Sequence, residues 1–185
     1  MPRQVAVLVG SLRKESLNRK TALALARLAP DSLKLEIVEI GQLEMYNQDL
    51  DEAPPQSWLD FRDWIKAADA VLFVTPEYNR SVPAALKNAI DIGSRPYGAS
   101  AWDGKPGGVV SVSPGAIGGF GANHHLRQSC VFLNIWLLQQ PEAYIGGAGE
   151  MFDADGKPDA RSEKFLRRYI AAYAAWVDKL LGGSG

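Results

Sequence analysis

Residues 69–91 read DAVLFVTPEYNRSVPAALKNAID, and this stretch decides the fold. Residues 69–76 form an apolar run without polar alternation, which is typical of a strand buried on both faces of a sheet. A run of helix formers follows near Pro83, a residue that suits the first turn of a helix because the N–H groups there are unpaired in any case. A buried strand followed by a helix predicts one βα unit of a parallel sheet.

The same alternation extends along the whole chain. Further strands are expected at residues 4–10, 33–40, 105–114 and 135–140. Further helices are expected at residues 17–29, 58–68, within 115–134 and at 162–181. Strands that alternate with helices join through right-handed crossovers, which place helices on both faces of a parallel sheet. The sequence therefore predicts a single α/β domain over residues 1–181, followed by a flexible tail at residues 182–185.

Composition narrows the classes of function. The chain has 185 residues, 46% hydrophobic and 22% charged, which suits one globular domain with a sizeable core. The formal net charge is −1 with both signs interspersed, so neither nucleic acid nor a membrane surface is an expected partner. The single cysteine, Cys130, excludes an intrachain disulfide. Because no apolar run approaches the roughly 20 residues of a membrane span and no signal peptide is visible, we expect a cytoplasmic protein.

Ligands of such sheets bind beyond the carboxyl ends of the strands, which draws attention to the loop after the first strand. This loop, GSLRKESLNR at residues 10–19, combines serine, asparagine and basic side chains with a helix that starts near Leu17. Free N–H groups at a helix N-terminus together with such donors suit a terminal phosphate. The patterns of a nucleotide P-loop and of a dinucleotide fingerprint are absent. A plainer alternative is that Ser16 only caps the helix.

The loop after the third strand, at residues 75–83, carries more chemistry than a turn requires. Pro76 favours extended backbone at the residue before it, and Ser81 is placed to cap the next helix. Residues 77–79, Glu-Tyr-Asn, offer backbone amides, an aromatic face and a side-chain amide. Those groups suit a planar heterocycle with a hydrogen-bonding edge. The alternative is a rigid turn with a surface tyrosine.

The loop after the fourth strand, SVSPGAIGGFG at residues 111–121, is rich in glycine. Glycine lets a backbone approach a flat ligand closely, although close packing of the following helix on the sheet would also explain it. A serine hydrolase would need GxSxG here, but Ser111 occupies the position of the first glycine. The loop is therefore not expected to carry a nucleophile.

Other candidate chemistry is weak. His124 and His125 would point about 100° apart on a helix, so they cannot share a metal ion as an i, i+4 pair could, and no metal site is expected. Cys130 is expected to be a buried helical thiol. The acidic segment 41–57 is longer than an ordinary connector, and we hypothesise that it covers the bound ligand from the same or a partner subunit.

Taken together, GSLRKESLNR and TPEYNRSVPAALKNAID resemble the NADPH-dependent FMN reductase family, in particular its bacterial quinone and chromate reductase branch. The likeness extends over nearly the whole chain and includes GKP, GAIGG, HHLRQ and QQPEAY. It implies a flavodoxin-like three-layer sandwich with a five-stranded parallel sheet of order 2-1-3-4-5 and a homodimer or homotetramer. It also implies FMN as cofactor, NADPH or NADH as reductant, and small-molecule acceptors such as quinones, flavins, azo compounds and metal oxyanions including chromate.

The resemblance assigns site residues motif by motif. The residues implied to hold the phosphate and ribityl chain of FMN are Ser11, Arg13, Ser16, Leu17 and Asn18. The residues implied to line the isoalloxazine ring are Pro76, Glu77, Tyr78 and Asn79, with Ser113 and Gly115 at its other edge. No protein residue is assigned as catalytic, because the flavin carries the redox chemistry and the protein positions it. Glu77 is expected to position the cofactor rather than to act as a base.

Two other functions remain open from the residues alone. One is a flavodoxin-like electron-transfer module that receives electrons from a protein partner, although such carriers use a strongly acidic docking face that this chain lacks. The other is a binder of a phosphosugar or nucleotide without flavin. Fold alone does not choose among these functions. The physiological acceptor, the preference between NADH and NADPH, and whether FMN stays bound or dissociates are not encoded in any motif of the sequence.

Overall fold

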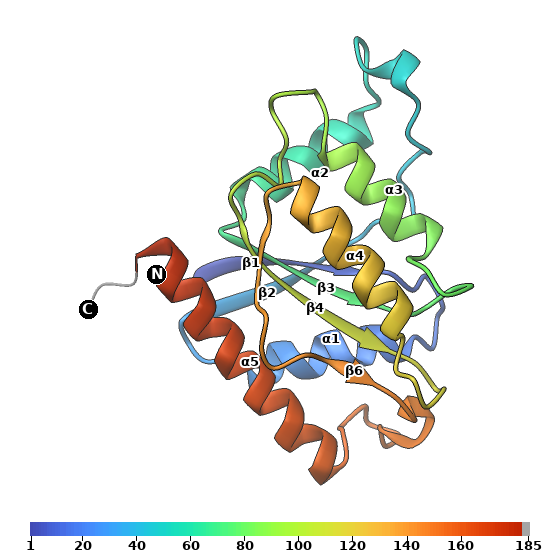
Figure 1. The fold of residues 1–185 in the computed structure, drawn as a ribbon, viewed down its shortest axis with the longest axis vertical. Helices are drawn as coiled ribbons and strands as arrows, with labels where there is room; N and C mark the ends of the chain where they lie inside the picture. Colours follow the sequence, from blue (N-terminus) through green and yellow to red (C-terminus); the bar gives the residue numbers. More distant parts are fainter. Residues whose placement is uncertain (183–185) are drawn as a thin grey trace.

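A parallel sheet forms the centre of the molecule (Figure 1). The computed structural model describes residues 1–182, so residues 183–185 of the predicted tail lie outside the described residues. The strand order is β2-β1-β3-β4-β5, with β6 paired to β4, which confirms the predicted order 2-1-3-4-5. The strands are β1 (Arg3–Val9), β2 (Leu33–Val38), β3 (Ala70–Thr75), β4 (Pro106–Val112), β5 (Trp136–Leu137) and β6 (Tyr144–Ile145).

Helices cover both faces of the sheet, as predicted (Figure 1). One apolar cluster joins a face of the sheet to α1 and α5 through residues such as Leu25 and Tyr173. A second cluster joins the opposite face to α2, α3 and α4 through residues such as Trp58, Leu86 and Leu126. The helices are α1 (Leu17–Leu28), α2 (Gln56–Ala67), α3 (Ala84–Gly93), α4 (Phe120–Phe132) and α5 (Ala160–Leu181).

A glycine in β4 allows α5 to lie close to the sheet. A Cβ atom at Gly108 would lie 2.8 Å from Tyr169 Oη and 2.9 Å from Tyr173 Cδ2. The two hydroxyls instead donate hydrogen bonds to strand carbonyls, Tyr169 to Val109 at 3.3 Å and Tyr173 to Val71 at 2.8 Å. Burial raises the pKa of both phenols, so they remain neutral donors. This packing fixes α5 across the sheet.

The predicted strand at residues 135–140 is wrong in its extent. The strand within that range, β5, has two residues, and the chain then leaves the ladder before β6 pairs with β4 again. Pro141 lies in this interruption and has no N–H to donate. Side chains of α4 hold the segment: Arg127 Nη1 donates to the Leu138 carbonyl at 3.2 Å, and buried Asn123 Nδ2 donates to the Ala143 carbonyl at 3.3 Å.

The long acidic segment is fastened to the second and third helices. The Tyr46 N–H donates to Asn88 Oδ1 at 2.8 Å, and both Asn88 Nδ2 and Trp58 Nε1 donate to the Glu44 carbonyl at 3.1 Å. The Tyr46 and Trp58 rings pack 5.5 Å apart. Met45, which lies between Glu44 and Tyr46 in the sequence, is 69% exposed. The segment is therefore anchored at Glu44 and Tyr46 and presents Met45 to solvent.

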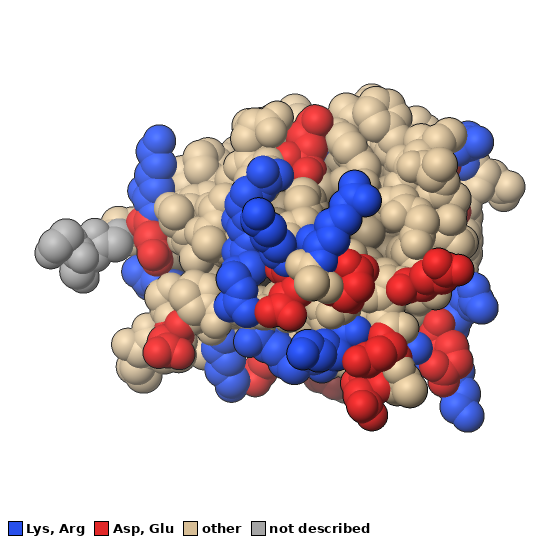
Figure 2. All heavy atoms as spheres, turned by 90° about the horizontal axis from the view of Figure 1, so that it is seen from below, with Lys and Arg blue, Asp and Glu red and all other residues tan. Residues whose placement is uncertain are grey.

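Charged side chains of both signs lie close together on the surface. Figure 2 shows the face seen from below, where basic side chains gather near the middle with acidic ones beside them. Exposed ion pairs include Arg167 with Glu163 at 2.8 Å and Lys20 with Glu15 at 3.4 Å. Within residues 1–182, no helix has the length and apolar character needed to cross a membrane.

Candidate functional site

The three loops singled out from the sequence meet at the carboxyl edge of the sheet, because β1, β3 and β4 are parallel neighbours. The Gly10 N–H donates to the Val74 carbonyl at 2.9 Å. A Cβ atom at Gly10 would lie 3.0 Å from Thr75 Oγ1 and 3.2 Å from Pro76 Cδ. The absence of a side chain at Gly10 therefore lets the first and second loops touch.

The first loop ends in a capped helix. Ser16 has extended backbone, and its Oγ accepts a hydrogen bond from the Arg19 N–H at 3.1 Å, which confirms Ser16 as the N-cap of α1. The hydroxyl proton of Ser16 stays free to donate. The N–H groups of Leu17 and Asn18 have no acceptor within the helix. The amino end of α1 therefore retains donors that can bind an anion.

The basic side chains of this loop differ in whether they are free to contact an anion. Arg19 forms a hydrogen-bonded ion pair with Glu39, which raises the pKa of Arg19 and lowers that of Glu39. Arg13 is exposed, and Ser11 beside it is buried. Arg13 and its exposed neighbour Lys14 can therefore turn toward an anion, whereas Arg19 is held by Glu39 at the end of β2.

Asn18 carries an unsatisfied buried atom at the same place. Its side chain is 4% exposed, and its Nδ2 donates to the Val112 carbonyl at 3.4 Å. Its Oδ1 is buried without a hydrogen-bond partner in the described residues. A buried acceptor left without a donor costs about 1–3 kcal/mol of free energy. A ligand hydroxyl or N–H that donated to Asn18 Oδ1 would remove this cost.

The second loop contains a tight hairpin. Tyr78 and Ser81 exchange backbone hydrogen bonds of 3.0 and 2.9 Å, and Asn79 and Arg80 between them have φ of 49° and 64°. Two left-handed residues in a two-residue loop form a type I′ turn. Tyr78 is 49% exposed. The turn therefore presents Tyr78 and Asn79 at the edge of the sheet.

The prediction that Ser81 caps the next helix is wrong. The N-cap of α3 is Pro83, and no side chain accepts a hydrogen bond there. The Ser81 hydroxyl instead lies 3.0 Å from Nδ1 of His125 on α4. The hairpin pairing of Ser81 with Tyr78 takes up its backbone and leaves its hydroxyl to bridge two elements.

Glu77 connects the second loop to the helix after the third. Its Oε2 accepts a hydrogen bond from the Ala122 N–H at 3.1 Å, and its Oε1 accepts one from Arg80 at 2.7 Å. Gly119, the N-cap of α4, has no side chain to cap it, so Glu77 performs that role from outside the helix. Burial would raise the pKa of Glu77, but hydrogen bonds from Ala122, Arg80 and Gly121 lower it overall. Glu77 is thus an ionised acceptor in this structure.

The third loop lies flat against the segment that follows β5. A Cβ atom at Gly118 would lie 2.6 Å from the Tyr144 carbonyl carbon, and one at Gly146 would lie 2.4 Å from the Ala116 oxygen. These glycines therefore serve close packing. Gly115 differs, because a Cβ there would meet only Ser113 Oγ, at 3.5 Å. Ser113 Oγ accepts a hydrogen bond from the Gly115 N–H at 3.1 Å, so this end of the loop keeps room for a ligand.

Sequence analysis missed a cluster at the start of α4. His124 Nε2 lies 2.9 Å from the Tyr144 hydroxyl, which donates to Glu142 Oε1 at 2.8 Å. The Phe120 ring packs 4.2 Å from the His124 ring and 5.2 Å from the Tyr144 ring. Burial, followed by the hydrogen bond to Glu142, raises the pKa of Tyr144 to about 12. The contact depends on β6, which the sequence pattern did not reveal.

The remaining candidate residues, Ser111 and Cys130, lie in the core of the fold. Ser111 and Cys130 are both fully buried, and burial raises the pKa of the Cys130 thiol to about 12, which confirms Cys130 as a buried helical thiol. Among the described residues, no group of three or more His, Cys, Asp or Glu side chains is placed to hold a metal ion.

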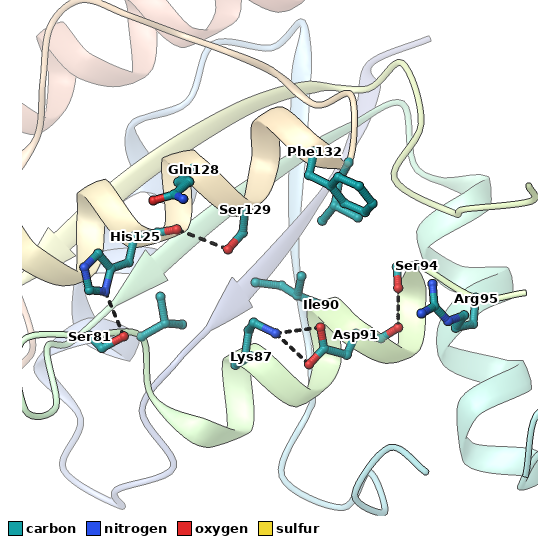
Figure 3. A pocket seen from close by; sticks show the side chains of 12 residues that line it. Ser81, Lys87, Ile90, Asp91, Ser94, Arg95, His125, Gln128, Ser129 and Phe132 are labelled. Atoms are coloured by element: carbon teal, nitrogen blue, oxygen red, sulfur yellow. Dashed lines mark hydrogen bonds and ion pairs between the residues drawn. The ribbon is translucent and has the colours of Figure 1, made fainter. Parts of the chain in front are cut away.

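A groove of about 560 Å³ lies between α3 and α4, with Ser81 and Val82 of the second loop at one end (Figure 3). The Lys87–Asp91 ion pair of 2.7 Å lines it from α3, with Ile90 beside this pair. Phe132 lines it from the end of α4 and is 81% exposed, and its neighbour Val131 is 79% exposed. Two large apolar side chains are therefore left in solvent beside this groove.

Comparison with known proteins gives one matching family and several similar reductases. The family model described as NADPH-dependent FMN reductase matches residues 3–150. A quinone reductase from Pseudomonas putida is 64% identical over 94% of both chains, and a 2-hydroxy-1,4-benzoquinone reductase from Burkholderia sp. is 47% identical over 96% of this chain and 97% of that one. The solved structure of a flavoenzyme NAD(P)H:(acceptor) oxidoreductase from Paracoccus denitrificans has a TM-score of 0.90 at 44% identity, covering 96% of this chain and 98% of that one.

Proposed function

Because the chain belongs to the NADPH-dependent FMN reductase family, we propose that it binds FMN at the three loops and uses electrons from NAD(P)H to reduce quinones. When bound, FMN supplies the redox chemistry by accepting a hydride from NAD(P)H and passing two electrons to the acceptor. The observation that carries the site assignment is the unpaired Oδ1 of buried Asn18 beside the free donors of α1.

The first loop fits the phosphate and ribityl parts of FMN. The N–H groups at the start of α1, the free hydroxyl proton of Ser16 and the Arg13 side chain would bind the phosphate. Asn18 Oδ1 would accept a hydrogen bond from a ribityl hydroxyl, which removes the cost of leaving that atom unpaired. Ser11 and Leu17 shape the floor of this part of the site, since Ser11 is buried and Leu17 packs on the core.

The second and third loops would hold the isoalloxazine ring. Pro76, Tyr78 and Asn79 would contact one side of it, and Ser113 with Gly115 would contact the other edge. Glu77 would act indirectly, because its carboxylate ties the second loop to α4. Backbone N–H groups aimed at the ring would stabilise the negative charge that reduction places there. The chain's task is therefore to bind and orient, without a protein nucleophile.

The acceptor is proposed to be a quinone, as in the relatives named quinone reductase and 2-hydroxy-1,4-benzoquinone reductase. An exposed ring face at the sheet edge would also admit free flavins, azo compounds and chromate. Tyr78 at 49% exposure and Phe120 at 49% exposure border this edge, and they favour flat aromatic acceptors because aromatic faces stack.

We also propose a homodimer formed through α3 and α4. Phe132 and Val131 are large apolar side chains left in solvent beside the groove between these helices. A two-fold axis beside the groove would bury the same side chains of both copies, which is how symmetric dimers cover such surfaces. A homotetramer would need a second contact in addition.

The direct test is steady-state oxidation of NADPH and NADH by the FMN-loaded chain, with and without a benzoquinone. The proposal predicts oxidation that requires FMN and rises with quinone concentration. A flavodoxin-like carrier would bind FMN yet leave the nicotinamide cofactor unoxidised. A chain that does not bind FMN at all would contradict both functions, and Ser16 in the first loop would then serve only as a helix cap.

A further inference from the structure

Quinone reduction needs a proton that neither NAD(P)H nor the electrons supply. A quinone becomes a hydroquinone by gaining two electrons and two protons, and a hydride from NAD(P)H accounts for two electrons and one proton. The balanced reaction is NAD(P)H + H⁺ + quinone → NAD(P)⁺ + hydroquinone. One further proton must therefore reach a quinone oxygen. This inference rests on the proposed quinone reduction.

The hydrogen bonds of Tyr144 determine which nitrogen of His124 is free. The Tyr144 hydroxyl donates its proton to Glu142 Oε1 at 2.8 Å. Its oxygen can therefore only accept from His124 Nε2 at 2.9 Å, so Nε2 carries a hydrogen. Nδ1 has no protein partner within residues 1–182 and is the atom that can take up and release a proton. The hydrogen bonds of Glu142 and Tyr144 thus keep a hydrogen on Nε2 of His124 and leave Nδ1 as the nitrogen that can gain and lose a proton.

This cluster borders the loops that would hold the ring. His124 lies in the second turn of α4, and the first turn of α4 is tied to Glu77 through Ala122. Gly118 packs directly on the Tyr144 backbone. The His124 side chain is exposed, and the adjacent Phe120 ring is 49% exposed. His124 therefore lies at the rim of the proposed site, where both the acceptor and solvent can reach it.

The charges around His124 come from three elements. Glu142, before β6, faces it through Tyr144. Arg127 on α4 acts on Tyr144 in the opposite sense and lowers its pKa, although burial and Glu142 prevail. On the second loop, Glu77 is neutralised by its ion pair with Arg80. Glu142 is accordingly the acidic group that faces His124 through Tyr144.

We propose that His124 is a catalytic acid that delivers, from Nδ1, the proton consumed in quinone reduction. Tyr144 and Glu142 are positioning residues that hold the His124 ring with Nε2 protonated, and Phe120 forms the aromatic wall against which a flat acceptor rests. The Nδ1–H bond breaks, the proton forms the O–H bond of the hydroquinone, and solvent then protonates Nδ1 again. The two electrons come from NAD(P)H.

The activity test compares His124→Gln with His125→Gln. Glutamine at position 124 keeps an N–H donor for Tyr144 but cannot release a proton. His125 bonds Ser81 instead, so it is the matched control. Turnover with a benzoquinone is divided by turnover with ferricyanide, which accepts an electron without a proton. We expect this ratio to fall about 100-fold in His124→Gln and to stay unchanged in His125→Gln.

An NMR measurement provides a further readout. In ¹H–¹⁵N spectra of the FMN-loaded chain at alkaline pH, neutral His124 should carry its hydrogen on Nε2, and Tyr144→Phe should abolish that preference.

Several results would overturn the inference while leaving the proposed function intact. These are an unchanged ratio in His124→Gln, an equal fall in both glutamine variants, or a tautomer that does not respond to Tyr144→Phe. If the wild-type chain oxidised no NAD(P)H with either acceptor, the proposed function itself would fail.

Discussion

Asn79 is a residue at which ligand binding can be separated from backbone strain. Its φ of 49° is in the left-handed region, which glycine adopts freely and alanine adopts at a cost of about 1 kcal/mol. Both Asn79→Gly and Asn79→Ala remove the side-chain amide. We expect FMN affinity, measured by quenching of flavin fluorescence, to fall in both variants.

Stability of the apoprotein should distinguish the two variants of Asn79. In urea unfolding, Asn79→Ala should lose about 1 kcal/mol, whereas Asn79→Gly should stay close to the wild type. If Asn79→Gly bound FMN as tightly as the wild type, the amide would have no part in binding, and the second loop would be the plain turn that the sequence left open.

Glu77 is expected to stabilise the fold through its charge. Glu77→Gln should lower the free energy of unfolding by about 1 kcal/mol, because it weakens the cap of α4. The lowered pKa of Glu77 means that this contribution is present above the carboxyl pKa of the unfolded chain. The contribution is lost as the pH falls through the lower pKa of the folded state. The wild type and Glu77→Gln should therefore converge in acid.

The control for Glu77 is Asp91→Asn, which removes a carboxylate from an exposed ion pair with Lys87. Such pairs contribute about 0.5 kcal/mol or less. Urea unfolding at several pH values measures both variants. A loss at neutral pH no larger in Glu77→Gln than in Asp91→Asn would contradict the capping role.

At the scale of elements, the amino end of α1 combines a structural and a binding role that a matched pair of caps can separate. Ser16 caps α1, and Asp159 caps α5 through the Arg161 and Ser162 N–H groups. Replacing either with alanine should cost about 1 kcal/mol of unfolding free energy. Only Ser16→Ala should also weaken FMN binding. Equal FMN affinity in the two variants would remove Ser16 from the phosphate site.

Local sequence patterns predicted well those elements that depend only on neighbouring residues. The helix start at Leu17 follows from its N-cap and is confirmed. The strand order was implied by the family resemblance and is confirmed as well. The break between β5 and β6 was missed because it depends on hydrogen bonds from Arg127 and Asn123 of the preceding helix, α4, to carbonyls that lie 11 and 20 positions further along the chain. Ser81 was wrongly assigned as a cap because its partner, His125, lies 44 residues away.

The same distinction applies to the candidate site. Each loop could be found from its residue types, and the structure brings all three to one edge of the sheet. The Glu77–Ala122 bond and the cluster of Phe120, His124 and Tyr144 join residues separated by up to 45 positions. No local pattern in a single sequence encodes such pairs.

At the scale of the whole molecule, the uncovered part of the α3 and α4 surface predicts self-association. Phe132→Asp would place a charge where the proposed dimer buries an aromatic ring, and a buried unpaired charge is strongly unfavourable. We expect the wild type to sediment as a dimer and Phe132→Asp as a monomer at the same concentration.

The control is Leu23→Asp, because Leu23 is 44% exposed and lies on α1, which covers the opposite face of the sheet (Figure 1). Leu23→Asp should sediment as the wild type does. A wild-type monomer, or a dimer that survives Phe132→Asp, would exclude this interface.

The account as a whole depends on direct reduction of a flavin held at the three loops. The most direct measurement is the visible absorption spectrum of the purified chain after removal of free FMN, followed by one equivalent of NADPH under anaerobic conditions. We expect flavin absorption near ~450 nm that bleaches on adding NADPH and returns on adding a benzoquinone. Absorption that persists after NADPH, or a chain that holds no FMN even when FMN is supplied, would contradict the account.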